Sequence, residues 1–241
     1  MKRTSTHYEM ELQGIKKNLL FEGALAEKAI QDVVTSLVDK KSDLARKVID
    51  RDVEIDKLDT EIEDQCIRLL ALRQPIAKDL RFITTAIKIN GHLERIGDMA
   101  VNIAERVLEL NELPQLKPYI DLPRMADIAR EMIRGSLDAL VNEDIELANR
   151  VRRMDDAVDK LNEQIFRELL TFMMEDPRTV HRALLITQIS KNLERISDHA
   201  KGISDMVVYM VTGESVRHQW PGEMPENNDK KRKSNENTPL L

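Results

Sequence analysis

The sequence of 241 residues has few of the residues that build sheets, tight turns and stacking surfaces. Aromatic residues make up 3% of the chain and glycines number eight, which leaves little material for strands and the turns between them. The formal net charge of −6 argues against a nucleic-acid-binding protein, which normally shows a basic face and often aromatic stacking platforms. A content of 41% hydrophobic and 33% charged residues instead favours a helix-rich, soluble protein.

Cysteine and long apolar runs are also scarce. The single cysteine, Cys66, excludes an internal disulfide, and its apolar surroundings in "DQCIRLLAL" indicate a buried structural thiol. No stretch approaches the ~18–20 uncharged apolar residues of a membrane span. The basic start "MKRTSTHYEMELQG" is not followed by the apolar segment of a signal peptide. We therefore expect a cytoplasmic protein.

Prolines and other breakers divide the chain into six long segments. Inside them apolar residues recur at steps of three and four, as at Leu93, Ile96 and Ala100, which is the stripe of an amphipathic helix facing a bundle. The expected helices cover about residues 5–39, 42–72, 77–110, 122–141, 144–173 and 178–211. The polar residues 213–241 are expected to form a disordered tail.

The six segments form a repeat. The motif "LERIGD" at 93–98 returns as "LERISD" at 193–198, and "DVEIDKLDTEI" at 52–62 matches "DDAVDKLNEQI" at 155–165. A proline break, Pro75 or Pro177, precedes each LERIxD helix. Because short connections make sequential helices antiparallel neighbours, each half should be a three-helix bundle. The predicted fold is all-α, with two tandem, pseudo-symmetric three-helix bundles over residues 5–112 and 120–212.

Pairs of acids four residues apart occur at matching places in both halves. The pairs are Asp52 and Asp56, Glu94 and Asp98, Asp155 and Asp159, and Glu194 and Asp198. On a helical wheel of about 100° per residue the acids of the LERIxD helices flank the apolar stripe. Two antiparallel helices could therefore bring four acids together along one seam at the edge of the core.

Such pairs favour a bound cation. Like charges at this spacing destabilise an isolated helix by a few tenths of a kcal/mol, so helix stability alone would not select four such pairs. Clustered carboxylates suit hard or borderline ions such as Mg²⁺, Mn²⁺, Ca²⁺ or iron, and zinc also remains open. The competing interpretation is a solvated acidic face on a helical scaffold, with local ion pairs such as Arg95 with Asp98.

A metalloenzyme or metal-storage bundle is a further alternative, but the sequence gives it no positive support. A ferritin-like di-iron site needs Glu-x-x-His motifs, and none of the five histidines follows a glutamate at that spacing. His92 and His199 fall away from the acids on the wheel and are expected at the surface. Glycine-rich phosphate loops, G-x-S-x-G motifs and Cys–His arrangements are absent from the sequence. We therefore expect a non-enzymatic protein.

The residues resemble a known family. The repeat itself, "PIAKDLRFITTAIKINGHLERIGDMAVNIAE", "LERISDHA" and "TFMMEDPRTV" are similar to the PhoU family of bacterial phosphate regulators, over about residues 5–212. The resemblance implies that E(D)xxxD motifs supply ligands for surface metal clusters. One site would use Asp52, Asp56, Glu94 and Asp98, and the other Asp155, Asp159, Glu194 and Asp198. The second copy departs from the first, because Gly202 replaces Asn102 and Phe166 replaces Glu63.

The resemblance also implies a function. PhoU-like proteins are negative regulators that link a phosphate ABC transporter, through its ATPase, to a sensor histidine kinase and so repress the phosphate-starvation response. The expected partners are therefore that ATPase and that kinase, with a homodimer and no nucleic acid. The membrane would be reached only peripherally, through the partners.

Overall fold

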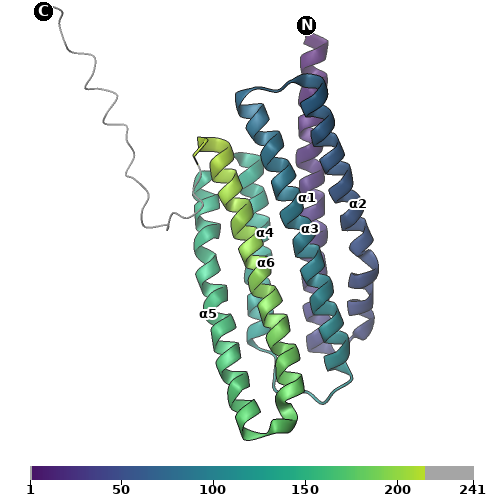
Figure 1. Ribbon diagram of the computed structural model, residues 1–241, viewed down its shortest axis with the longest axis vertical. Helices are drawn as coiled ribbons and strands as arrows, with labels where there is room; N and C mark the ends of the chain where they lie inside the picture. Colours follow the sequence, from purple (N-terminus) through teal and green to yellow (C-terminus); the bar gives the residue numbers. More distant parts are fainter. Residues whose placement is uncertain (1, 215–241) are drawn as a thin grey trace, which may run out of the picture.

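The computed structural model describes residues 2–214, and it consists of long helices arranged side by side (Figure 1). The helices are α1 (Lys2–Asp39), α2 (Ser42–Arg73), α3 (Ala77–Asn111), α4 (Asp121–Asn142), α5 (Ile145–Glu175) and α6 (Val180–Thr212), with a short 3₁₀ turn, η1 (Pro177–Thr179), before α6. The predicted all-α fold of six helices is confirmed, and each predicted end lies within three residues of an observed one. The predicted tail falls almost entirely at 215–241, outside the described residues.

Local chemistry sets the helix ends. Gln74 and Glu143 adopt left-handed backbone conformations with φ of 47° and 55°, which stop α2 and α4. The side chain of Asp144 accepts a hydrogen bond from the backbone N–H of Leu147 at 2.9 Å and caps α5. Asp176 does the same for η1 by accepting from the N–H of Arg178 at 3.0 Å. These tight connections hold sequential helices antiparallel.

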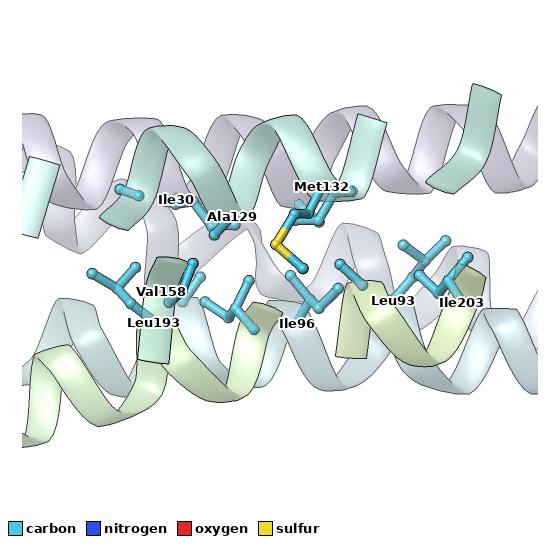
Figure 2. Packing of buried hydrophobic residues seen from close by; sticks show 14 of the residues in the cluster. Ile30, Leu93, Ile96, Ala129, Met132, Val158, Leu193 and Ile203 are labelled. Atoms are coloured by element: carbon cyan, nitrogen blue, oxygen red, sulfur yellow. The ribbon is translucent and has the colours of Figure 1, made fainter. Parts of the chain in front are cut away.

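The two helix triplets share one hydrophobic core. Helix α3 packs against α6, and α1 packs against α4, so that the halves meet along two helix pairs. Figure 2 shows Leu93 and Ile96 of the first half among Met132, Leu193 and Ile203 of the second. The buried apolar residues of both halves form a single continuous cluster. The two helix triplets are thus joined through a common interior. The division into separate domains at residues 5–112 and 120–212 stays a prediction.

Two simpler expectations concern Cys66 and the membrane. Cys66 is buried with a free thiol, as predicted, and burial followed by the charge of Glu63 raises its pKa to about 12. Such a thiol is inert at neutral pH. Among residues 2–214, no helix combines the length and the apolar character that a membrane span requires.

Candidate functional site

The acids of the first half lie between α2 and α3, and we call Asp52, Asp56, Glu94 and Asp98 the first seam. Asp52, Glu94 and Asp98 are half-buried, whereas Asp56 is exposed. Gly97 allows the two helices to approach closely, because a Cβ there would lie only 3.0 Å from Ile55 Cδ1 and 3.2 Å from Asp52 Oδ1. The four acids therefore lie along the facing helices α2 and α3, near enough for their charges to act on one another.

The carboxylates of the first seam repel one another. Partial burial, followed by the charges of Asp56 and Asp98, raises the pKa of Asp52 to about 6. Burial and then Asp98 also raise the pKa of Glu94, although Arg95 opposes this shift. Arg95 contacts Asp98 Oδ2 at 2.9 Å and Glu94 Oε2 at 3.4 Å, so the expected local ion pair is present. The Arg95 side chain is 60% exposed, and such surface pairs contribute about 0–1 kcal/mol.

A further carboxyl, which the sequence reasoning missed, lies behind the first seam. Glu22 of α1 is fully buried, and both of its side-chain oxygens lack a hydrogen-bond partner among the described residues. Burial raises the pKa of Glu22 to about 9, and the charges of Asp59 and Glu94 add to the shift. The signal in the sequence was its position, because Glu22 falls on the apolar stripe of Leu19 and Ala26.

The acids of the second half lie between α5 and α6, and we call Asp155, Asp159, Glu194 and Asp198 the second seam. Partial burial and then Asp155, Glu194 and Asp159 raise the pKa of Asp198 to about 6. Partial burial, followed by Asp155 and Glu194, also raises the pKa of Asp159. Asp155 is only 2% exposed, so the expected accessible position at the flank of the core is wrong for this residue.

Lysines contact the second seam. Lys201 Nζ lies 2.5 Å from Asp155 Oδ2, and Lys191 Nζ donates to Glu194 Oε1 at 2.8 Å. The other oxygen of Asp155 has no hydrogen-bond partner among residues 7–214. Among the described residues, lysines therefore reach two acids of the second seam and none of the first.

The donor chemistry of both seams fits a hard cation, although the side chains are not arranged as a closed cage. Within the described part of the chain, no three His, Cys, Asp or Glu side chains are placed to hold a metal ion as they stand. The oxygens come from side chains that can rotate, and carboxylate oxygens are what Mg²⁺, Mn²⁺ and Ca²⁺ prefer. The unpartnered carboxyl of Glu22 is the observation that most directly favours a ligand. Metal ligation by the eight acids stays a prediction.

The expected surface position of His92 and His199 is wrong. The two rings meet in the interface of α3 and α6, with Nδ1 atoms 2.9 Å apart and ring centroids 5.1 Å apart. A wheel for one helix could not show this contact, because it depends on how the two halves pack. Burial, Arg95 and Arg195 lower the pKa of His199, which favours the neutral ring that one of the two must have to accept a hydrogen bond.

The same interface explains one departure between the two copies. A Cβ at position 202 would lie 2.6 Å from Cε1 of His92, so Gly202 leaves room for that ring. Asn102 holds the matching place in the first half. The loss of the Asn side chain in the second copy therefore has a packing cause that is independent of any ligand.

These features define the class of the protein: an all-helical tandem repeat in which each three-helix unit carries a seam of carboxylates. The chain matches the PhoU domain family twice, over residues 21–107 and 122–207. It therefore belongs to the PhoU family.

Relatives of known name agree with this assignment. The chain is 40% identical over 215 residues to the "Phosphate-specific transport system accessory protein PhoU homolog" of Pseudomonas putida, covering 89% of this chain and 84% of that protein. It is 41% identical over 209 residues to the protein of the same name from Aquifex aeolicus, covering 87% and 95%. The crystal structure of PhoU from Pseudomonas aeruginosa superposes with a TM-score of 0.83 at 38% identity, covering 86% and 100%. That of the phosphate transport system regulatory protein PhoU from Streptococcus pneumoniae gives 0.80 at 27% identity, covering 87% and 99%.

Proposed function

We propose that this protein is a non-enzymatic regulatory adaptor of phosphate uptake that represses the phosphate-starvation response when phosphate is plentiful. The observation that carries the proposal is the match of both halves to the PhoU domain, together with relatives named as accessory proteins of phosphate-specific transport. The matches cover 84% and 95% of the length of those two relatives. The role proposed here is therefore that of the whole relative.

The proposed partners are the ATPase of a phosphate ABC transporter and a sensor histidine kinase, both reached from the cytoplasm. A surface suited to protein contact supports an adaptor role. Phe166, Leu170 and Met174 form an exposed apolar row along α5, and Val180 and Leu184 of α6 are also exposed. Exposed apolar groups that gather in this way are typical of protein–protein contact sites.

The metal-binding part of the proposal uses the two seams. Asp52, Asp56, Glu94 and Asp98 would hold a hard cation in one half, and Asp155, Asp159, Glu194 and Asp198 in the other. A bound cation supplies positive charge that offsets both the partial burial and the neighbouring negative charges that raise the pKa values of Asp52 and Asp198. The protein's own residues would bind the ion and fix the helix pairs α2 with α3 and α5 with α6.

Deletion of the gene in its own host tests the regulatory role. In phosphate-rich medium we expect alkaline phosphatase, a reporter of the starvation response, to rise to the level of phosphate-starved cells, because the repressing adaptor is lost. A plasmid copy of the wild-type gene should return it to the low level. An unchanged level in the deletion strain would reject the adaptor.

Elemental analysis tests metal binding. Replacing Glu94→Gln together with Asp98→Asn should reduce the manganese retained after dialysis, because two of the four oxygen ligands of the first seam lose their charge. The matched control is Glu61→Gln with Asp64→Asn, which removes two exposed acids of α2 outside the seam. Equal metal content in the two variants would favour a solvated acidic face, and retention of many ions per chain would favour storage.

A further inference from the structure

The repeat register can be followed from the seams into the first helix of each half. Asp52 matches Asp155, and counting back along the chain pairs Lys40 with Glu143 at the preceding turn. Both turn residues have φ of 55°, which confirms that the register holds through the turn. Continuing into the first helix of each half, Glu22 of α1 matches Met125 of α4.

The two halves differ in charge at this buried position. Met125 is fully buried like Glu22, but it is apolar, and its sulfur accepts a hydrogen bond from Ser190 at 3.6 Å. The single hydroxyl proton of Ser190 is shared with Asn162 Oδ1, which lies nearer, at 2.6 Å. The second half thus places a neutral, partnered group where the first half places an acid.

The residues near Glu22 also differ in charge between the two halves. Asn162 matches Asp59 of the first half, and Ser190 matches Asn90. Asn90 donates to the side chain of Asp59 at 2.6 Å and to its backbone carbonyl at 2.8 Å. Asn90 thus donates to Asp59 rather than to Glu22, whose two oxygens lack a hydrogen-bond partner among the described residues. The interior behind the first seam therefore holds two carboxyls that the second half lacks.

The two seams also differ in their basic side chains, and here the second half has more of them. Lys191 and Lys201 hold Glu194 and Asp155 in the second seam. The matching places in the first half are Gly91 and Val101, which carry no charge. The first half therefore has two more acids beside its seam, Glu22 and Asp59, and no lysine at the two matching places, and Arg95, the ion-pair partner of its seam, is largely exposed.

A buried carboxyl without a partner is costly to the fold. Leaving such a polar group unsatisfied costs about 1–3 kcal/mol, and native proteins avoid it unless the group has another role. Helix α1 packs against both α2 and α3, and the unpartnered carboxyl of Glu22 lies on its fully buried side. A cation between α2 and α3 would therefore meet Glu22 from the core side, where the charges of Asp59 and Glu94 also act on it. Hard divalent ions take about six to eight oxygen ligands, so a ligand from a third helix completes a set that two helices supply in part.

We infer that the two seams are unequal: the first binds a hard divalent cation with Glu22 of α1 as an inner ligand, and the second, in which Lys191 and Lys201 already pair with two of the four acids, binds it much more weakly. This inference rests on the proposed metal binding. It adds a ligand from α1, so that the ion ties all three helices of the first half together.

Titration of the full-length, metal-free protein with Mn²⁺, followed by calorimetry and by the free-ion electron paramagnetic resonance signal, tests the inference. The wild type should show one tight site. Glu22→Gln, which keeps shape and removes charge, should weaken that site at least about 10-fold, the low end of what loss of even an outer partner of a metal site costs. Asp159→Asn in the second seam is the matched control and should leave the tight site unchanged. Circular dichroism of each variant verifies that it is folded.

The outcomes separate this inference from the proposed function. If Mn²⁺ binds and Asp56→Asn weakens it while Glu22→Gln does not, metal binding stands and the role of Glu22 is rejected. If Asp159→Asn weakens the tight site as much as Glu22→Gln, the inequality of the seams is rejected. Absence of Mn²⁺ binding to the wild type would reject metal binding itself. As a gain-of-function arm, Met125→Glu with Lys201→Gln should create a second tight site.

Discussion

Replacing Glu22 by methionine, the residue that the second half uses, is expected to raise the free energy of unfolding of the metal-free protein by about 3–4 kcal/mol at pH 7. Glu22 is fully buried and both of its oxygens lack partners among the described residues, so the folded state bears the full cost of removing them from water. Methionine is flexible and fills the same kind of space without a polar group. Urea unfolding in the presence of a chelator, followed by circular dichroism, measures the change.

The pH dependence of the free energy of unfolding distinguishes the removal of a buried carboxyl from a general improvement in packing. The pKa of Glu22 is near 4.5 when unfolded and about 9 when folded, so between these values the folded state binds more protons. Stability therefore falls as the pH rises through this window, by about 1.4 kcal/mol for each pH unit from this group. Asp52 and Asp198, whose pKa values are raised to about 6, contribute a similar fall only between about 4 and 6, in both proteins.

In the Glu22→Met variant, stability should no longer fall with rising pH above pH 6. The two stability curves should therefore converge toward pH 4.5 and separate as the pH rises to 8. Parallel curves over that range would show that Glu22 does not titrate with a raised pKa. Met125→Glu, the reverse exchange in the other half, is the control and should lower stability with the same pH dependence.

The fold could be predicted because its signals are local. Apolar residues at steps of three and four define a helix within a dozen residues, and the matching LERIxD segments reveal the repeat without knowledge of any contact. The expectation that the acids of α2 and α3 lie on facing helices also followed from local rules, because short connections make neighbouring helices antiparallel. These steps needed only the geometry of one helix and its nearest neighbour.

What the sequence did not reveal depends on packing between distant segments. Glu22 falls on an apolar stripe, but its importance depends on α1 covering the back of the first seam. The contact of His92 with His199 requires α3 to pack on α6, which a wheel for either helix cannot show. Likewise, Lys201 reaches Asp155 from a neighbouring helix and alters the second seam. In each case a third or a distant helix decides the environment of a residue that was visible in the sequence.

A large loss of stability is also expected when the continuous core is disrupted. Leu93 of α3 is fully buried and belongs to the cluster that includes residues of both halves (Figure 2). Leu93→Ala should lower the free energy of unfolding by about 2–5 kcal/mol, since it removes buried methyl groups and leaves a cavity that the packed helices fill only in part. Leu72→Ala, at a position that is 71% exposed, should change stability by less than about 0.5 kcal/mol.

Segment-resolved hydrogen exchange decides whether the two repeats unfold together. Since α3 packs on α6 and the buried apolar cluster runs through both halves, Leu93→Ala should accelerate exchange of the most protected amides of α2 and α5 by similar factors. Two independently folding bundles would respond differently, with faster exchange in α1, α2 and α3 and unchanged protection in α4 and α5. Cooperative unfolding would also mean that the repeat acts as a single unit in the cell, because an ion bound to one seam would then stabilise both halves by mass action.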